Sequence, residues 1–460
     1  MSKTNRRKAF AVVAAAALVV AACGDDDDDD AEETTETTGA TATTAAPATT
    51  AAPATTAAPA TTTEETTAEG TTEATEPETT AAAEPPTGEP IKIGILTSIT
   101  TNFAPWGLQV RDGAQLAVDD INAAGGVDGR PLELVIEDDQ NAAEEAVPAY
   151  ERLLEEGVVA IGGIISSTVG GATSPLAETN QMPTFLVKSG DQTILTPDSR
   201  YVFRTCLPAA PMVAGPIIEY AQENGLSKLG AIVADYPWGH AFQASIESAV
   251  AEAGDIELHL ETAPVPEQDF TTYLRAIDEF GPDLLVGTGH PPGGGPIIAQ
   301  SNDLGMEMPV IGAYSPWALV MGGAGDAALD RYADFDCADF QSDEYQELAR
   351  RFLEFSTDNT FMDDDAIAAY GIVTMISQAV AEVGDDPAAI GEWLHTQEFD
   401  LPGYPFTMSW TEWGELAAAQ PLFSIVRGGA APEGLNNAGD WYPETLLLPT
   451  PLTPYDPAAG

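Results

Sequence analysis

The chain has 460 residues, of which 44% are hydrophobic, so it is long enough for two or three domains with real cores. Its formal net charge is −56, from 73 acidic and 17 basic residues. This balance argues against nucleic acid and anionic membrane surfaces as partners, because no basic stripe can neutralise phosphates. The three cysteines form no CxxC motif or Cys/His cluster, which argues against a structural zinc site.

The first 23 residues have the pattern of an export signal. Four basic residues precede an apolar stretch at 9–22, which is shorter than the about 20 residues of a membrane-spanning helix but suits a secretory signal. The sequence VAAC at 20–23 resembles the bacterial lipobox, in which the cysteine is acylated and becomes the new N-terminus. We therefore expect an exported protein, lipid-anchored through Cys23 to the outer face of the cell membrane or in the periplasm. The alternative is an ordinary signal peptide with a chance cysteine.

Residues 24–90 have the composition of a disordered spacer. They contain 17 acidic residues and no Lys or Arg, and they repeat ATTAAP three times between residues 42 and 59. With no aromatic residues, this segment cannot bury enough surface to fold. The six aspartates at 25–30 are interpreted as a solvated run and not as a calcium site, because contiguous like charges repel.

From residue 91 the chain alternates between predicted strands and helices. The first block has strands at 91–98, 131–139, 158–165 and 183–187, with helices at 107–124, 142–156 and 168–179. The second block has strands at 201–206, 229–235, 256–262, 283–289 and 309–313, with helices at 210–224, 239–253, 270–280 and 296–304. Such alternation predicts an α/β fold with parallel sheets covered on both faces, and two blocks predict two similar lobes.

The loops at the carboxyl ends of these strands are where a ligand is expected to bind. With two lobes, those strand ends can face each other across a cleft. None of the loops contains GxSxG, HExxH, a P-loop, or GxGxxG with an acidic residue on the next strand. These absences argue against a dinucleotide enzyme, and we expect no metal or cofactor.

The start of the folded part resembles a known family. It combines Trp106-Gly107, a helix that ends in DINAAGG at 120–126, a turn with Gly129, and a strand that ends in Asp138-Asp139. In these features it is similar to the leucine/isoleucine/valine-binding proteins, the type I extracellular solute-binding proteins of ABC importers. The resemblance covers about 91–427. It implies two Rossmann-like lobes, joined by three crossovers, that close on a small ligand without catalysis.

The implied architecture sets the expected domain boundaries. They are a signal peptide and lipobox at 1–23, a linker at 24–90, lobe 1 at 91–206 and 338–405, lobe 2 at 207–337 and 406–446, and a C-terminal tail at 447–460. The implied function is a monomeric receptor that captures a small polar ligand, an amino acid of branched-chain type, and delivers it to an ABC permease. A short amide or urea-like ligand, a non-α amino acid, and a sensor without transport remain alternatives.

The resemblance also implies ligand contacts in lobe 1. Ser166, followed by Ser167, matches the serine that holds the ligand's carboxylate, and free amides at the start of the next helix suit an anion. The alternative is that these residues only cap that helix. Ser189 and Asp191 fall on contact positions after the fourth strand. Asp191 replaces a threonine, so it could accept from an amine or amide, or it could pair with Lys188 instead.

Two tryptophans and a histidine fall on further implied contacts. Trp106 and Trp238 occupy aromatic positions, one in each lobe, and each could pack against a flat ligand surface. The alternative for both is packing in the core. His290 stands beside Gly289, which replaces a contacting aromatic residue, so His290 is either a ligand contact or a solvated loop residue.

Tyr314 replaces the family's glutamate that neutralises the ligand's ammonium. A phenol cannot supply a full charge, so Asp191 or one of the acids at 363–365, with Asp365 as the candidate, could substitute. The alternative is that these three acids only open a helix, where the dipole favours them.

Cys206 and Cys337 end strands that match two of the lobe crossovers. Because exported proteins meet an oxidising environment, we expect one disulfide across the hinge; two free thiols are the alternative.

Overall fold

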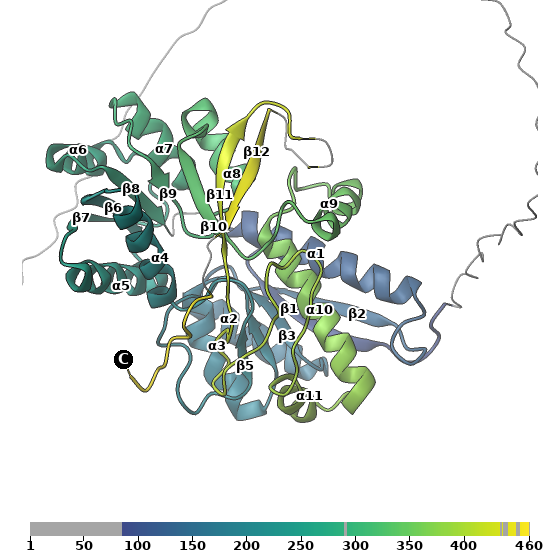
Figure 1. The fold of residues 1–460 in the computed structure, drawn as a ribbon. Helices are drawn as coiled ribbons and strands as arrows, with labels where there is room; N and C mark the ends of the chain where they lie inside the picture. The colour runs from purple at the N-terminus through teal and green to yellow at the C-terminus, as the bar shows by residue number, and fades with distance from the viewer. Residues whose placement is uncertain (1–84, 289–291, 433–434, 436–439, 448–450, 460) are drawn as a thin grey trace, which may run out of the picture. The chain divides into compact units, whose positions relative to one another are not determined.

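The computed structural model describes residues 85–288, 292–432, 435, 440–447 and 451–459. The predicted signal sequence, Cys23 and nearly all of the predicted linker therefore lie outside the described residues. The compact unit that spans Glu78–Gly460 contains two separate sheets, one in each lobe (Figure 1). The predicted α/β class with two parallel-sheet lobes is confirmed.

The sheet of the first lobe has five parallel strands in the order β2-β1-β3-β4-β5. The strands are β1 (Ile91–Thr97), β2 (Leu132–Asp138), β3 (Ile161–Ile164), β4 (Thr184–Leu186) and β5 (Val202–Arg204). The helices are α1 (Ala104–Ala123), α2 (Ala143–Glu155), α3 (Ser167–Asn180), α9 (Asp343–Phe355), α10 (Asp364–Val383) and α11 (Pro387–Leu394). Helix α10, which comes from late in the chain, packs along α1 and completes this lobe.

The sheet of the second lobe has seven strands in the order β12-β11-β10-β9-β8-β6-β7. The parallel strands are β6 (Lys228–Ala234), β7 (Glu257–Ala263), β8 (Leu284–Thr288), β9 (Val310–Ile311) and β10 (Tyr332–Asp336); the antiparallel strands are β11 (Leu422–Gly428) and β12 (Trp441–Leu447). The helices are α4 (Ala210–Glu223), α5 (Pro237–Ala253), α6 (Thr271–Phe280), α7 (Gly294–Asp303), α8 (Trp317–Ala324) and the 3-10 turn η1 (Gly325–Ala328).

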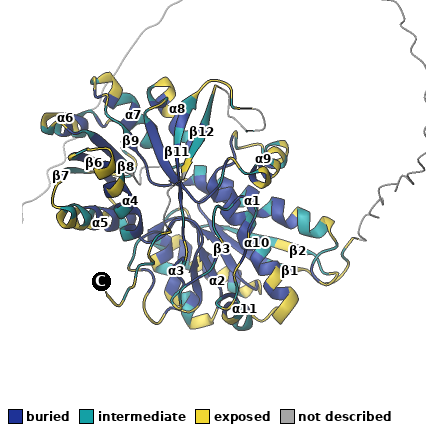
Figure 2. Ribbon diagram, in the orientation of Figure 1, coloured by how far each residue is buried: buried dark blue, intermediate teal, exposed yellow. Residues whose placement is uncertain are grey.

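Local sequence explains where these elements begin and end. Strand β1 is buried along most of its length, as expected for a parallel strand covered on both faces (Figure 2). Helix α1 begins three residues earlier than predicted because Pro105 stands in its first turn, where a proline costs no hydrogen bond. It ends before Gly126, which has φ 72°, and a Cβ on Gly126 would lie 2.1 Å from the carbonyl oxygen of Arg130. Only glycine fits this turn.

Helix α10 passes the length and composition test for a membrane span, with a mean hydropathy of 1.5 over its most apolar window. However, 67% of that window is buried inside the protein. Its apolar residues contact α1 and β3, so it is a core helix of the first lobe.

Cys206 and Cys337 form the expected disulfide, with their Cα atoms 5.2 Å apart and the two residues 131 positions apart in sequence. Cys206 directly follows the β5 region and Cys337 directly follows β10, so the bond joins two crossovers between the lobes. A covalent bond therefore holds the two crossovers together at the hinge, in addition to side-chain packing.

The expected start of the lobe 2 return at residue 406 is too early. Trp410 donates its indole N–H to the carbonyl oxygen of Arg204 at 2.6 Å, and Glu415 pairs with the Arg204 guanidinium at 2.9 Å. Two short antiparallel bridges, 399 with 408 and 410 with 416, hold this segment in a hairpin beside β5. The chain returns to the second sheet only at β11.

The segment 451–459 contacts both lobes. The Leu452 amide donates to the Ala419 carbonyl oxygen at 2.8 Å, and Trp413 donates its indole N–H to the Tyr455 carbonyl oxygen at 3.1 Å. The Tyr455 amide approaches Met212 Sδ of α4 at 3.4 Å. The end of the chain is therefore an additional connection across the hinge.

The disulfide gives the first prediction. Replacing both cysteines with serine is expected to lower the free energy of unfolding by about 2–5 kcal/mol, because the unfolded chain loses a long covalent loop. Chemical denaturation of the wild type and the double variant measures this difference. Mass spectrometry of unreduced peptides should find residues 206 and 337 in one linked pair; two alkylatable thiols in the native protein would contradict the disulfide.

Candidate functional site

Residues from both lobes enclose a small cavity of about 20 Å³. It is lined by Phe103, Trp106, Ile165, Lys188, Leu207, Tyr236, Trp238, Ala313, Tyr314 and Ser315. A cavity of this size holds about one water molecule. A larger ligand can enter only if the lobes or these side chains move apart, which the hinge between the lobes allows.

The cavity lies at the start of four helices. Its wall includes residues at or just before the first turns of α1, α3, α5 and α8, each of which follows a strand of the same lobe. The first amides of a helix lack intrahelical partners, and the helix dipole is positive at this end. The surroundings of the cavity therefore favour negative charge.

Five of the ten described residues that line the cavity are aromatic, and they connect the two lobes. The Phe103 ring lies 5.3 Å from the Trp106 ring of the same lobe and 5.8 Å from the Tyr236 ring of the other. Trp238 packs on Gly190, where a Cβ would fall 2.2 Å from the indole. Glycine at position 190 thus lets a tryptophan of the second lobe approach the first lobe closely.

Lys188 is the only charged side chain among the described residues that line the cavity. Its Nζ donates to both carboxylate oxygens of Asp364 at 2.8 Å and to the carbonyl oxygen of Tyr314 at 3.3 Å, and it lies 4.9 Å from the centre of the Tyr314 ring. Burial alone would lower the pKa of Lys188, but Asp364 and Asp365 outweigh burial and raise it. Lys188 is therefore a buried ammonium. The alternative predicted from sequence, in which Lys188 pairs with Asp191, is wrong.

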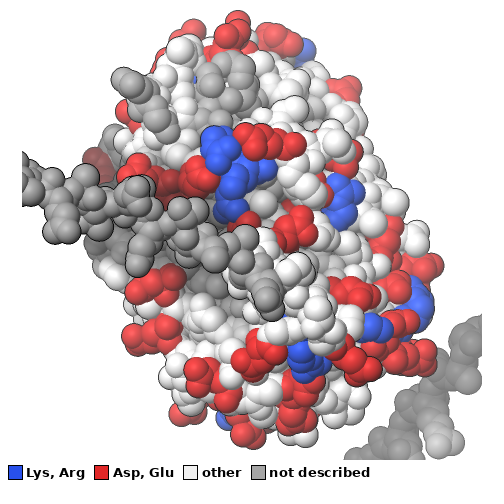
Figure 3. Space-filling view, turned by 90° about the vertical axis from the view of Figure 1, so that its right-hand side faces the viewer, with Lys and Arg blue, Asp and Glu red and all other residues white. Residues whose placement is uncertain are grey.

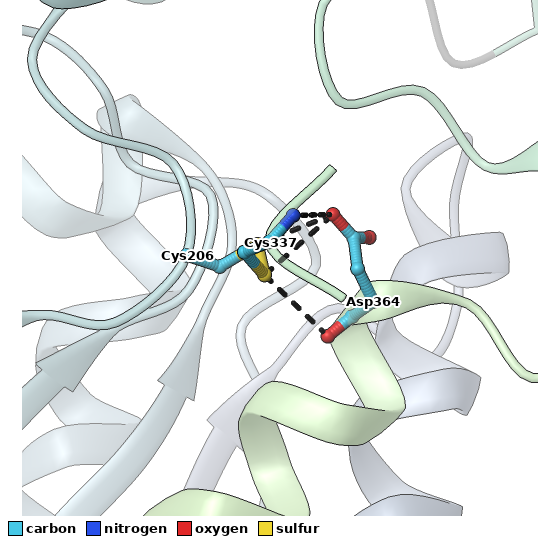
Figure 4. Close-up of side chains that lie close together, drawn as sticks. All are labelled: Cys206, Cys337 and Asp364. Carbon is cyan, nitrogen blue, oxygen red and sulfur yellow. Dashed lines mark hydrogen bonds between the residues drawn. A yellow bond between two sulfur atoms is a disulfide. The ribbon is translucent and has the colours of Figure 1, made fainter. Parts of the chain in front are cut away.

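Asp364 connects Lys188 to the disulfide. Its Oδ2 accepts a hydrogen bond from the Cys337 amide at 3.4 Å and lies 3.2 Å from Cys206 Sγ (Figure 4). The disulfide sulfurs carry no hydrogen, so the sulfur contact is one of packing. Cys206, Cys337 and Asp364 are also close enough to hold a metal ion, but sulfurs bonded to each other supply no thiolate, and the group does not fit a metal.

Four further aspartates are buried near Asp364. Asp336 accepts from the Trp317 indole at 2.8 Å, and Asp363 accepts from the Trp317 amide at 3.1 Å. Neither carboxylate oxygen of Asp365 has a hydrogen-bond partner among the described residues, and Lys188 Nζ lies 4.0 Å away. Burial raises the pKa of all three well above the usual range, and it raises the pKa of Asp334 to about 6. A single lysine cannot neutralise this group, so protonation must supply the rest of the charge balance.

The backbone of Tyr314 is held in an unusual conformation. Its φ is 59°, in the left-handed region that costs a non-glycine residue roughly 1–2 kcal/mol. The Asp334 carboxylate accepts from the amides of Tyr314 at 2.7 Å and Ser315 at 3.0 Å, which offsets that cost. This turn places both residues in the cavity wall.

Arg204 holds the loop that follows Lys188. Its guanidinium is fully buried and donates to the carbonyl oxygens of Ser189 and Asp191, the latter at 2.7 Å. Its Nε donates to Glu415 at 2.9 Å. Burial raises the pKa of Glu415, although Arg204 opposes that rise. Through Arg204, the hairpin at 408–416 therefore stabilises the loop that follows Lys188.

The sequence-derived candidates fall into several groups in the structure. Trp106, Trp238 and Tyr314 meet around the cavity. Ser167 and Asp191 line a neighbouring hollow of about 480 Å³ instead. The Asp191 carboxylate accepts from the Thr193 amide at 2.9 Å and its hydroxyl at 2.8 Å.

The remaining candidates do not line the cavity. Ser189 donates to the carbonyl oxygen of Ser166 at 2.9 Å, and Ser166 Oγ caps α3 by accepting from the Thr168 amide at 3.2 Å. Asp365 lies behind Lys188, and His290 lies outside the described residues.

Sequence reasoning missed Phe103, Tyr236 and the central place of Lys188. Each of these residues stands in a loop that directly follows a strand of its sheet, where ligand contacts are expected. Phe103 and Tyr236 also lie three and two residues before the tryptophans already chosen. Lys188 could have been recognised from sequence. It stands two residues after a fully buried strand, and a lysine at such a place needs a buried partner.

The buried acids give a second prediction. A carboxyl with a raised folded-state pKa binds its proton more tightly in the native state, so its stabilising contribution is present at low pH and lost as the pH rises through that pKa. The unfolding temperature is therefore expected to fall between pH 5 and pH 8. Asp365→Asn should make this fall smaller, because it removes one of these carboxyls.

Thermal melts of both proteins across this pH range measure the effect. Asp303→Asn, at an exposed position near the end of α7, is the matched control and should leave the slope unchanged. Equal slopes for wild type and Asp365→Asn would contradict the assignment of Asp365 as a protonated buried acid.

Comparison with known proteins adds independent findings. The model of the periplasmic binding protein family matches residues 90–430. Leu/Ile/Val-binding protein homolog 3 of Brucella melitensis is 24% identical over 350 residues, which cover 73% of this chain and 91% of the relative.

Two solved structures have the same two-lobed fold. A leucine-binding protein of Thermotoga maritima is 20% identical with a TM-score of 0.67, covering 78% of this chain and 99% of that one. A solute-binding protein of an ABC transporter from R. palustris, in complex with benzoate, is 20% identical with a TM-score of 0.68, covering 80% of this chain and 98% of that one.

Proposed function

Because the chain belongs to the periplasmic binding protein family, we propose that it is an extracellular solute-binding protein that captures a small carboxylate between its lobes and delivers it to an ABC permease. The observation that carries the ligand class is the buried ammonium of Lys188 in a cavity wall without acidic side chains. The name of the R. palustris structure, a solute-binding protein of an ABC transporter, supports the transport role. No catalytic step is part of the proposal.

Lys188 is the proposed anchor for the carboxylate. An ammonium group has three N–H donors, and the contact of Lys188 with the Tyr314 carbonyl oxygen, at 3.3 Å, is longer than its contacts with Asp364. A ligand carboxylate could replace this weaker contact without breaking the ion pair. The four helix N-termini around the cavity support negative charge at the same place.

An α-amino acid fits this cavity less well than a simple carboxylate. Among the described lining residues no carboxylate is available for an ammonium group, since Asp364 is bound to Lys188 and Asp365 lies behind it. We therefore propose an apolar carboxylate without an α-ammonium over the branched-chain amino acid that the resemblance implied. The leucine and benzoate in the names of the two solved structures represent these two options. An uncharged amide would offer the Lys188 ammonium no second carboxylate beside that of Asp364.

Trp106 and Trp238 are proposed to hold the apolar part of the ligand. They come from different lobes, and both are nearly fully buried, at 6% and 2% exposed. A ligand that touches both indoles stabilises the closed arrangement of the lobes and leaves the open one unaffected. The closed form with bound ligand would then be the form that the permease recognises.

Export and lipid anchoring belong to the same proposal. The family consists of proteins that bind solutes outside the cytoplasm, which supports an exported chain. Acylation at Cys23 would keep the binding lobes next to the permease, with the acidic linker as a tether. Cys23→Ala should release the protein from cells into the medium, which immunoblotting of membrane and soluble fractions detects.

A ligand panel tests the proposed class. Benzoate and 4-methylpentanoate are expected to raise the unfolding temperature, and ligand at 100 times its dissociation constant adds about 2.7 kcal/mol. Leucine and 4-methylpentanamide, which match the second carboxylate in shape, should give smaller shifts. Stabilisation by leucine but by neither carboxylate would support the amino-acid alternative, and stabilisation by the amide alone would remove Lys188 from the site.

Lys188→Met is expected to weaken carboxylate binding by roughly 10- to 150-fold, the value of a hydrogen bond to a charged group. Because this change leaves Asp364 buried without its partner, Lys188→Met/Asp364→Asn is the matched variant that keeps the charge balance. Isothermal titration of both variants with benzoate measures the loss. Wild-type affinity in the double variant would show that the ammonium is not a ligand contact.

The surface charge predicts an unusual salt dependence. Acidic side chains are spread over the face shown in Figure 3, with a few groups of basic side chains between them. Arg350 forms exposed ion pairs with Glu347 and Glu354. An anionic ligand must approach against this repulsion, which salt screens. The association rate of benzoate should rise roughly two- to tenfold between about 10 and 300 mM NaCl, and the dissociation rate should change less. Stopped-flow tryptophan fluorescence measures both rates; a falling association rate would contradict an anionic ligand.

A further inference from the structure

The indole N–H of Trp106 lacks a hydrogen-bond partner among the described residues. Trp106 is 6% exposed and lines the cavity between the lobes. The N–H groups of three other tryptophans, Trp317, Trp410 and Trp413, each donate to an oxygen, at 2.8, 2.6 and 3.1 Å. Buried polar groups are almost always paired, so an exception in the wall of a ligand cavity calls for an explanation by function.

Hydroxyl groups of Tyr236, Tyr314 and Ser315 also line the cavity, but no described residue accepts a hydrogen bond from the Trp106 N–H. The nearest described ring is that of Phe103, and the wall continues through Ile165, Leu207 and Ala313, whose side chains are apolar. The charged group in this wall, the Lys188 ammonium, is itself a donor only. The Trp106 N–H and the Lys188 ammonium can both only donate, so a ligand that binds both groups needs two acceptors.

We infer that the Trp106 indole N–H binds a second oxygen of the ligand and selects carboxylates that carry a hydroxyl, carbonyl or ether oxygen apart from the carboxylate. The inference rests on the proposed function, in which Lys188 receives the carboxylate. It gives Trp106 a role in specificity that differs from packing against the apolar body. A phenylalanine at this position could supply the packing but not the selection.

The selection arises from what happens to the N–H when the cavity closes. A ligand with a second oxygen pairs the donor, whereas a purely apolar carboxylate of the same shape excludes water and leaves it unpaired. A site that hydrogen-bonds a ligand group rejects an analogue that lacks this group, because the polar groups of the site are then buried without a hydrogen-bond partner. The difference for one neutral hydrogen bond corresponds to roughly tenfold in affinity.

Pairs of ligands with matched shapes test this selection. The probes are 4-oxopentanoate against 4-methylpentanoate, and 4-methoxybenzoate against 4-ethylbenzoate, each pair titrated calorimetrically into the full chain. We expect the wild type to prefer the oxygen-bearing member of at least one pair by about tenfold. Trp106→Phe should reduce that preference to within about twofold, mainly by weakening the oxygen-bearing member.

Phe103→Leu is the control for a general change in the same wall. It alters the neighbouring ring without removing the indole N–H, so it should weaken both members equally and keep their ratio. The wild-type comparison needs no variant, so the inference can be tested even if Trp106→Phe folds poorly.

The outcomes separate this inference from the proposed function. Binding of both members of each pair with equal affinity to the wild type, or an equal loss for both in Trp106→Phe, would overturn the role of the indole and leave the carboxylate class intact. If no probe carboxylate binds at all, the carboxylate class fails, and the selection by Trp106 fails with it.

Discussion

The buried ion pair between Lys188 and Asp364 is the interaction on which the arrangement of the site depends. It joins the loop after β4 to the start of α10, and it touches the Tyr314 turn on one side and the disulfide on the other. Burying two charges costs free energy, and removing either partner alone leaves the other as an uncompensated buried charge. The pair therefore fixes how the first lobe, the hinge and the cavity wall meet, and it places one ammonium in the cavity wall.

Much of the fold could be predicted from the sequence, because the alternation of buried strands and helices is a local signal. The antiparallel β11 and β12 and the hairpin at 408–416 could not. The hairpin is held by contacts such as Arg204 with Glu415, which are 211 positions apart. No pattern within 408–416 indicates a partner that far away in the chain. The sequence therefore predicts too early a start, at residue 406, for the return to lobe 2.

The site shows the same division between local and distant information. That Trp106, Trp238 and Tyr314 meet at one cavity could be predicted, because they stand near the carboxyl ends of strands, on positions where the resemblance implies ligand contacts. The partner of Lys188 could not, since Asp191 is three residues away and Asp364 is 176. Closeness in sequence suggested the wrong pair, while the parallel topology brings the start of α10 beside the end of β4. The role of Ser166 as a helix cap follows from local rules and was among the alternatives.

The disulfide at the hinge changes the topology of the second lobe. Everything between Cys206 and Cys337, which includes α4 to α8 and β6 to β10, becomes a ring closed at its base by a sulfur bridge. A protease that cuts one loop of this ring separates no fragment from the molecule, since both new ends stay tied to the first lobe. If the protein is exported, as proposed, a single cut by an extracellular protease would therefore leave the two lobes joined.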